Sequence, residues 1–133
     1  MEEYLFKDLT SSIIQAFYKV YNTLGYGFLE KVYENALRIE LLKSGFDVEK
    51  QKPVKVFYDS IVVGEYFADL IVDGKVIIEL KTSDSLIEEH ECQLINYLKA
   101  TDIEVGLLLS FGKTPIIRRK IFMNKNKSGL YDN

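Results

Sequence analysis

Three charged side chains, Asp69, Glu79 and Lys81, stand in the apolar segment 68–81, whose two halves are joined by an Asp-Gly pair. Both halves have the composition of buried strands, so these side chains fall where an interior is expected. A buried charge without a partner is strongly destabilising. The three groups must therefore neutralise one another, coordinate a ligand or be less buried than the pattern suggests.

The same residue types suit metal chemistry. Glu79 and Lys81 are two positions apart and would point to one face of a strand, while Asp69 lies on the neighbouring strand. Two carboxylates supply the oxygen ligands that Mg²⁺ or Mn²⁺ prefers, and a lysine ammonium can orient or stabilise an attacking hydroxide. The alternative is a buried ion-pair network without chemistry, and these residues alone leave both interpretations open.

The turn at Asp73-Gly74 decides whether Asp69 and Glu79 can meet. A two-residue hairpin loop would pair Val72 with Lys75 and leave the two carboxylates on opposite faces of the sheet. A three-residue loop or a bulge shifts the pairing by one residue and brings them across from each other. The metal hypothesis therefore predicts this odd register.

A further acidic candidate, Glu30, lies in the segment 27–33, Gly-Phe-Leu-Glu-Lys-Val-Tyr. Glu30 and Tyr33 are three positions apart and share a helix face, which indicates that Glu30 lies toward the covered side. The alternative is an acidic residue favoured in a first helical turn by the helix dipole.

Three polar residues, His90, Gln93 and Tyr97, form a stripe on a later predicted helix. Their spacings of three and four put them on one face, and the chain connection lays that face against the sheet near Lys81. A lone histidine or tyrosine on a helix is usually a satisfied core group. Three polar side chains beside a carboxylate pair favour a site, with His90 as an accessory candidate.

Hydrophobic periodicity predicts the elements that hold these residues. Helices are expected over about 9–24, 28–44 and 85–101, the last opened by a Ser85-Leu-Ile-Glu88 capping box. Strands are expected at about 48–58, 62–72, 75–81, 103–109 and 116–123. The Asp-Gly turn makes one strand pair antiparallel, whereas the third helix connects parallel strands. The continuous apolar runs 76–78 and 105–109 indicate strands covered on both faces, so we expect an α/β fold, a three-layer α/β/α sandwich with a mixed central sheet.

Composition limits the class of protein. At 133 residues and 47% hydrophobic, residues 1–133 are expected to form a single domain with a real core. Cys92 is the only cysteine, which excludes an internal disulfide and a thiolate zinc cluster. No apolar run is long enough to span a bilayer, so no membrane partner is expected and a cytoplasmic location is the simplest interpretation.

Charge restricts how the chain could hold nucleic acid. The formal net charge is -3, so any contact with a polyanion must use a local patch. Arg118 and Arg119, followed by Lys120, are candidates for phosphate contacts, and a second basic group lies at 50–55. Charge alone favours the alternative that these residues protect a sheet edge and solvate the surface.

The motifs taken together resemble a known family. Asp69 followed by Glu79-Leu-Lys81, and then by Gln93-Leu-Ile-Asn-Tyr97, resembles the PD-(D/E)XK nuclease superfamily. The segment 27–33 is similar to the signature of its GxxExxY branch. The likeness extends over about 13–122, with the motifs in the family's order.

The resemblance implies a restriction-endonuclease-like fold and a nuclease that uses Mg (or Mn) on DNA or RNA. It assigns Asp69 and Glu79 as metal ligands and Lys81 as the catalytic lysine. Glu30 would be an additional acidic site residue, and the helical motif, Gln93 with Tyr97, would lie near the substrate phosphate. The chain departs from common patterns of the family at four positions, namely Tyr21, Tyr26, Phe67 and Ala68.

Two functions therefore remain open. The first is a metal-dependent phosphodiesterase, in which the carboxylates hold the cation and Lys81 positions the attacking water. The second is a non-catalytic interaction module with a nuclease fold that works with a protein partner. The intact Glu79 and Lys81 favour the first. The acidic composition favours weak or partner-assisted binding of nucleic acid, and a homo-oligomer is also open.

Overall fold

The computed structural model describes residues 5–130, which form three helices, five strands and a short 3₁₀ turn. In chain order the elements are α1 (Lys7–Leu24), α2 (Glu30–Lys43), β1 (Val48–Tyr58), β2 (Ile61–Val72), β3 (Val76–Lys81), α3 (Glu88–Lys99), β4 (Val105–Phe111), β5 (Pro115–Ile121) and η2 (Asn124–Asn126). The predicted order of helices and strands is confirmed, with boundaries that differ by a few residues.

The five strands form one mixed sheet in the order β1-β2-β3-β4-β5. Strands β1, β2 and β3 are successively antiparallel, β3 and β4 are parallel, and β5 is antiparallel to β4. The parallel pair is the one connected through α3, because a parallel connection must carry the chain back across the sheet. The mixed sheet predicted from the Asp-Gly turn and the third helix is confirmed.

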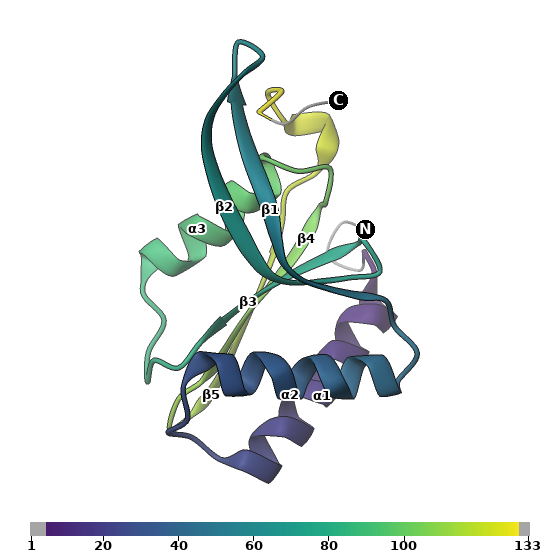
Figure 1. Cartoon of the computed structure of the whole chain (residues 1–133), viewed down its shortest axis with the longest axis vertical. Coiled ribbons are helices and arrows are strands. Elements are labelled where there is room, and N and C mark those ends of the chain that lie inside the picture. Colours follow the sequence, from purple (N-terminus) through teal and green to yellow (C-terminus); the bar gives the residue numbers. More distant parts are fainter. Residues whose placement is uncertain (1–4, 131–133) are drawn as a thin grey trace.

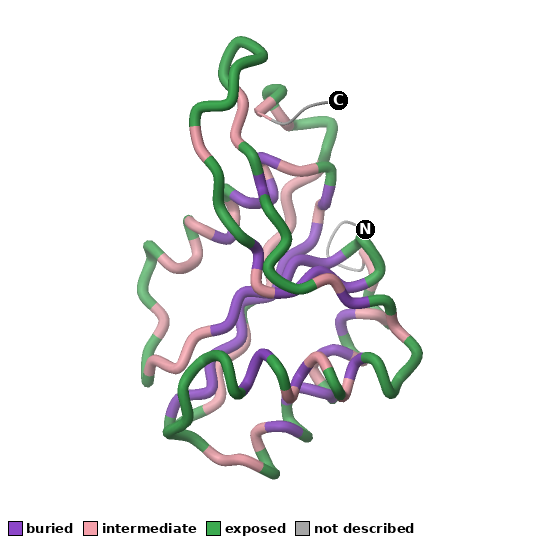
Figure 2. The backbone as a smooth tube through the Cα atoms, viewed as in Figure 1, coloured by how far each residue is buried: buried purple, intermediate pink, exposed green. Residues whose placement is uncertain are grey.

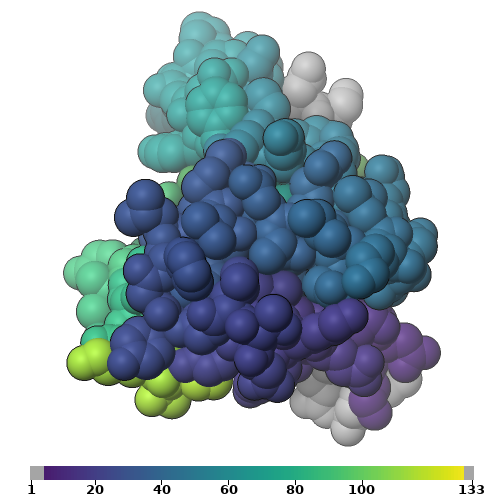
Figure 3. Space-filling model, turned by 60° about the horizontal axis from the view of Figure 1, so that its bottom comes forward, coloured from purple at the N-terminus to yellow at the C-terminus, as the bar shows by residue number. Residues whose placement is uncertain are grey.

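Helices cover both faces of the sheet, in three layers (Figure 1). Buried residues of α1 and α2, among them Phe17 and Leu37, pack on one face against Ile78 and Leu107. Figure 3 shows these two helices side by side on this face. On the other face, α3 packs against the sheet through residues such as Leu94. Buried residues are concentrated in β3 and β4 (Figure 2), as their continuous apolar runs predict.

The β2–β3 connection has the predicted odd register. Val72 pairs with Val76, so the loop consists of the three residues 73–75. Asp73 and Gly74 have φ angles of 53° and 64°, the left-handed region that Gly and Asp tolerate best. The ladder continues only to the pair Leu70 and Ile78.

Beyond this ladder, the β1–β2 hairpin leaves the rest of the sheet. We call its residues 52–68 the β1–β2 arm; it extends past the other strands in Figure 1 and is exposed near its tip in Figure 2. The arm carries exposed apolar side chains, including Ile61, Val63 and Phe67. Near the tip, the amide of Phe57 donates to the carbonyl of Leu130, which ties β1 to the C-terminal segment at 2.8 Å.

The predicted capping box at Ser85-Leu-Ile-Glu88 is wrong. Helix α3 begins at Glu88, and Ile87 occupies the N-cap position. The preceding loop is held against the end of β4, because the hydroxyl of Ser110 donates to the carbonyl of Ser83 at 2.6 Å and the amide of Lys113 donates to Asp84 at 2.9 Å. These long-range bonds hold Ser83 and Asp84 against the neighbouring strand and loop, and the helix starts three residues after Ser85.

No helix within residues 5–130 is long and apolar enough to cross a membrane.

Candidate functional site

Asp69 and Glu79 lie side by side at the point where β2 leaves β3. The backbone amide of Asp69 donates to Oε2 of Glu79 at 2.9 Å, and the amide of Leu80 donates to Oδ2 of Asp69 at 2.8 Å. The two side chains thus take over the hydrogen bonding where the strand ladder ends. Each carboxylate is oriented by the backbone of the other strand, which is the pairing that the odd register requires.

The side chains of β2 change from one face of the sheet to the other at Asp69. In a regular strand, residues two apart point to the same face. Leu70, however, packs with α1 and α2, whereas Ala68 packs with α3. The pairing with β1 is interrupted at the same place. Lys50 pairs with Leu70 and Lys52 pairs with Ala68, and no pair is formed between them. This rotation places Asp69 at the edge facing β3, where it reaches groups on both sides of the sheet.

The carboxylate pair is electrostatically unfavourable without a cation. Glu79 is only 6% exposed, and burial, followed by repulsion from Asp69, raises its pKa to about 8. Burial also raises the pKa of Asp69, against the opposing effect of the hydrogen bond from Leu80. Lys81 favours the charged form of both carboxylates, but it does not offset their burial.

Lys81 lies near the carboxylates without forming a direct ion pair with them. Within the described chain, none of the ion pairs joins Lys81 to Asp69 or Glu79. Its charge nevertheless acts on Asp69, Glu79 and Glu30. The closed Asp-Lys-Glu salt-bridge network that the sequence left open is therefore not what this structure contains.

Glu30 is the first residue of α2, and the prediction that it faces the covered side is wrong. Glu30 is exposed, whereas Tyr33 is fully buried. The hydroxyl of Tyr33 donates to the carbonyl of Gly25 at 2.7 Å and accepts from the amide of Phe28 at 3.2 Å. Its ring stacks on Phe111 with 4.2 Å between centroids. Tyr33 thereby anchors the α1–α2 loop that leads into Glu30.

The start of α2 brings Glu30 into the electrostatic environment of the site. Partial burial raises the pKa of Glu30, with Lys81 lowering it and Asp69 raising it further. His90 of α3 also acts on Glu30. The N-terminal ends of α2 and α3 therefore both approach the carboxylate pair, although Glu30 sits at its exposed rim.

On α3, the residues of the predicted polar stripe make two separate sets of contacts. Nε2 of Gln93 donates to the hydroxyl of Tyr97 at 2.9 Å. Tyr97 is buried, and its pKa is raised by burial and by the charge of Glu79. Nδ1 of His90 instead accepts from the amide of Ile87 at 3.4 Å, at the start of its own helix.

The arginine pair is not brought into the site. Arg118 and Arg119 lie on β5, which is separated from β3 by β4. They pair with Leu108 and Leu107, which pack on opposite faces, so the two arginines do not form one patch. Arg119 donates to the carbonyl of Leu5, and burial lowers its pKa.

The residues present fit a hard divalent cation with few protein ligands. No group of three or more acidic, histidine or cysteine side chains gathers as a metal cluster in the part of the chain that the structure describes. Mg²⁺, however, is often held by one or two carboxylates and otherwise keeps water and substrate oxygens. A desolvated pair such as Asp69 and Glu79 would be relieved by this charge, so the donor set suits Mg²⁺ or Mn²⁺ better than a metal that needs a closed protein cage.

Two polar residues near Asp69 were missed from the sequence. Glu34 of α2 is 4% exposed, and its Oε1 accepts from Nε2 of Gln51 at 2.6 Å. The same nitrogen donates to Oδ1 of Asp69 at 3.2 Å. The only signal in the sequence is a charged residue beside Tyr33 on an otherwise apolar helix face, since nothing local marks Gln51.

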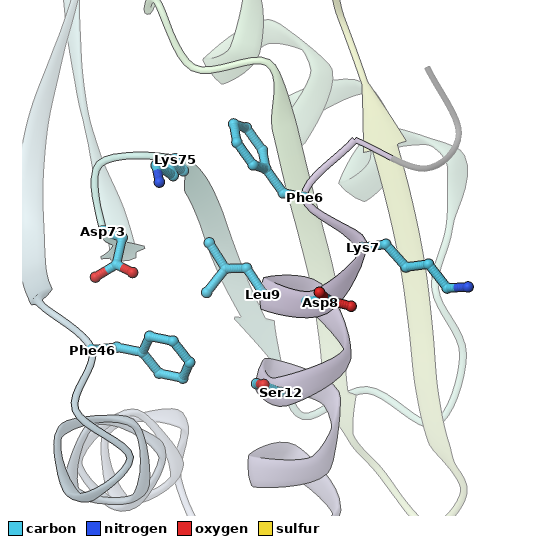
Figure 4. A pocket seen from close by; sticks show the side chains of 8 residues that line it. All are labelled: Phe6, Lys7, Asp8, Leu9, Ser12, Phe46, Asp73 and Lys75. Atoms are coloured by element: carbon cyan, nitrogen blue, oxygen red, sulfur yellow. The ribbon is translucent and has the colours of Figure 1, made fainter. Parts of the chain in front are cut away.

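A separate cavity of about 500 Å³ lies at the opposite end of β3 from Lys81. Its walls include Phe6 and Leu9 at the start of α1, Phe46 after α2, and the turn residues Asp73 and Lys75 (Figure 4). None of the predicted site residues lines this cavity. The candidate chemistry therefore belongs to the point where β2 leaves β3.

Comparison with known proteins identifies the family. A sequence model of the PD-(D/E)XK nuclease superfamily matches residues 7–121, and the chain belongs to this superfamily. Its mixed sheet flanked by helices is the restriction-endonuclease-like fold. The match does not distinguish the GxxExxY branch, which stays a prediction.

A solved structure described as "Crystal structure of SSO0001" is similar in fold. Its TM-score is 0.57 at 23% sequence identity, and the match covers 71% of this chain and 50% of that chain. The chain thus matches about half the length of that protein, and the likeness concerns the fold alone. The comparison with curated proteins found no match.

Proposed function

We propose that this protein is a metal-dependent nuclease that hydrolyses phosphodiester bonds in DNA or RNA. In this proposal Asp69 and Glu79 hold Mg²⁺ or Mn²⁺, and Lys81 orients the attacking water. When bound, the cation supplies Lewis-acid polarisation of the scissile phosphate and lowers the pKa of a coordinated water. Membership of the superfamily supports the reaction class, since its nucleases typically use divalent metals.

One observation carries the proposal: two desolvated carboxylates on adjacent strands, Asp69 and Glu79, are oriented side by side with Lys81 near them but not paired to them. A merely structural ion cluster would be expected to pair its charges directly. The unfavourable arrangement is instead suited to receive a cation and a water molecule. Perturbed pKa values of this kind are common at functional sites.

The other residues have supporting roles in this proposal. Lys81 donates a hydrogen bond that holds the water in line with the phosphorus atom. Gln93 and Tyr97, linked to each other and near Glu79, contact the substrate phosphate from α3. Glu30, at the exposed rim, accepts a proton or orients a water on the solvent side, because burial and neighbouring carboxylates raise its pKa.

The test is cleavage of labelled DNA and RNA, single- and double-stranded, with Mg²⁺, with Mn²⁺ and with EDTA. Lys81→Ala should reduce the rate by at least about 100-fold, the loss expected when a reacting group is no longer held in position. Lys75→Ala, at the other end of β3, is the matched control and should cleave at the wild-type rate. Metal-independent cleavage, or equal rates for wild type and Lys81→Ala, would contradict the proposed mechanism.

A second candidate function is the non-catalytic interaction module. The exposed apolar side chains of the β1–β2 arm, including Ile61 and Val63, favour it because contiguous exposed apolar surface often binds a protein partner. An absence of cleavage on every substrate, together with normal folding and no binding of Mn²⁺, would favour this second function over the nuclease.

A further inference from the structure

Gln51 has an unusual backbone conformation. Its φ angle is 49°, in the left-handed region that residues other than Gly, Asn and Asp rarely adopt. It lies where the β1–β2 pairing steps from Lys50 with Leu70 to Lys52 with Ala68. Because strained residues persist only where the surrounding structure holds them, such a position calls for a reason in the contacts of its side chain.

The side chain of Gln51 bridges two carboxylates. Its Nε2 donates to Oε1 of Glu34 at 2.6 Å and to Oδ1 of Asp69 at 3.2 Å. A primary amide nitrogen carries two hydrogens, so one group can satisfy both acceptors. The reverse orientation would point the amide oxygen at two carboxylates, and their repulsion selects the orientation with nitrogen toward the acids.

Glu34 gives this bridge a fixed anchor. Its carboxylate is buried on α2, where Oε2 also accepts from Nζ of Lys31 at 2.9 Å. The lysine offsets the charge of Glu34, and the helix holds the carboxylate in place. The amide of Gln51 is therefore attached at one end to a rigid acceptor and at the other to Asp69.

Both oxygens of Asp69 are thus held before any ligand binds. Oδ1 accepts from Gln51 and Oδ2 accepts from the amide of Leu80 at 2.8 Å. With Oδ2 bonded to β3 alone, the carboxylate could still rotate about that bond. The contact from β1 fixes its plane, in the way that outer hydrogen-bond partners orient metal-ligating side chains.

We infer that Gln51 is a positioning residue, whose side-chain amide, anchored on Glu34, holds the Asp69 carboxylate beside Glu79 in the orientation that binds the cation. This inference rests on the proposed function, because Gln51 would act only by orienting Asp69 as a ligand of the cation. It also explains why a left-handed glutamine is present inside β1, opposite Asp69.

Gln51→Gly is the direct test, because glycine adopts the positive φ without strain and the substitution removes the side chain with its amide. Ser60→Gly is the matched control: Ser60 also has a positive φ, of 63°, and it lies in the exposed β1–β2 turn. By isothermal titration, Gln51→Gly should bind Mn²⁺ about 10- to 100-fold more weakly, the usual cost of losing an outer partner. Ser60→Gly should bind as wild type and keep the wild-type melting temperature. Gln51→Gly should remain folded, because Lys31 still pairs with the carboxylate of Glu34.

Gln51→Glu extends the test, because it keeps the length of the side chain and places a third carboxylate between Glu34 and Asp69. It should weaken Mn²⁺ binding at least as much as Gln51→Gly. Wild-type affinity in both variants would overturn the inference and leave the proposed function standing.

A metal-free readout separates the two proposals. The amide proton of Leu80 donates to Asp69, so NMR of the apo protein should show it shifted upfield and exchanging faster in Gln51→Gly, but not in Ser60→Gly. An unchanged Leu80 signal would overturn the inference. If wild type binds no Mn²⁺, the proposed function fails, and the Leu80 signal still decides whether Gln51 orients Asp69.

Discussion

The two ends of β3 differ in polarity and in the strands that they pair with. At its start, Val76 and Ile78 are fully buried, apolar and paired with strands on both sides. At its end, Glu79 and Lys81 keep β4 as a partner, while β2 has turned away and side chains replace the ladder. Within six residues, one strand passes from a core that stabilises the fold to a polar edge that does not. The difference indicates that the site is placed where the sheet divides.

The comparison is testable because substitutions at neighbouring positions of β3 should change the free energy of unfolding in opposite directions. The largest loss of stability is expected for Ile78→Ala, since Ile78 is 0% exposed between α1, α2 and the adjacent strands. Truncating such a side chain should lower the free energy of unfolding by about 2–5 kcal/mol. Urea denaturation measures this change, with Ile78→Val as the milder control at about 0.5–1.5 kcal/mol. A loss below about 1 kcal/mol, well under this range, would mean that this end of β3 is loosely packed.

Glu79→Gln should stabilise the metal-free protein, and the gain should depend on pH. Folding raises the pKa of Glu79 from 4.5 to about 8, so the folded state retains a proton that the unfolded chain releases. The contribution of Glu79 to stability is therefore present below pH 4.5 and is lost as the pH rises to about 8. Glutamine keeps an oxygen for the amide of Asp69 and does not titrate.

At about 1.4 kcal/mol per pKa unit, the gain from Glu79→Gln should reach a few kcal/mol near pH 8 and be small near pH 5. Denaturant curves of both proteins at the two pH values measure it. Equal stability of wild type and variant at pH 8 would show that the carboxylate is not strained by its burial. The same substitution should abolish metal binding, so stability and function would be opposed at one residue.

A bound cation should stabilise the polar end of β3 and so reduce the difference in stability between its two ends. At a hundredfold excess over its Kd, Mn²⁺ should raise the free energy of unfolding by about 2.7 kcal/mol, because it binds only the folded state. Asp69→Asn keeps an acceptor for the amide of Leu80 but loses the charge, so it should lose this effect. Thermal melts with and without Mn²⁺ provide the measurement. If both proteins shift equally, the metal binds elsewhere.

The smallest effect is expected in the β1–β2 arm. Val63 is 62% exposed on the part of β2 that has left β3. Val63→Thr keeps the β-branched shape, so the free energy of unfolding should change by less than about 0.5 kcal/mol. A larger loss in urea denaturation would show that the arm is packed against something, for example a second copy of the chain. In that case, the loss should grow with protein concentration.

The local patterns of the sequence were sufficient for the elements and their layers. Apolar residues at helical spacing predicted α1 and α2, and continuous apolar runs predicted the buried strands β3 and β4. The Asp-Gly turn, combined with the chemistry of Asp69 and Glu79, predicted the three-residue loop that the structure has. These inferences succeeded because periodicity, turn conformation and residue type are properties of neighbouring residues.

Contacts between distant segments decided the rest. The change of side-chain face at Asp69 and the left-handed Gln51 arise where β1, β2 and α2 meet, and no pattern around Gln51 marks them. The start of α3 was moved from Ser85 to Glu88 by bonds to the end of β4 and the loop after it. The sequence by itself determined which groups could do chemistry and on which strands they lie. Tertiary packing alone decided their orientation and their pKa values, because burial and hydrogen-bond partners come from residues far apart in the chain.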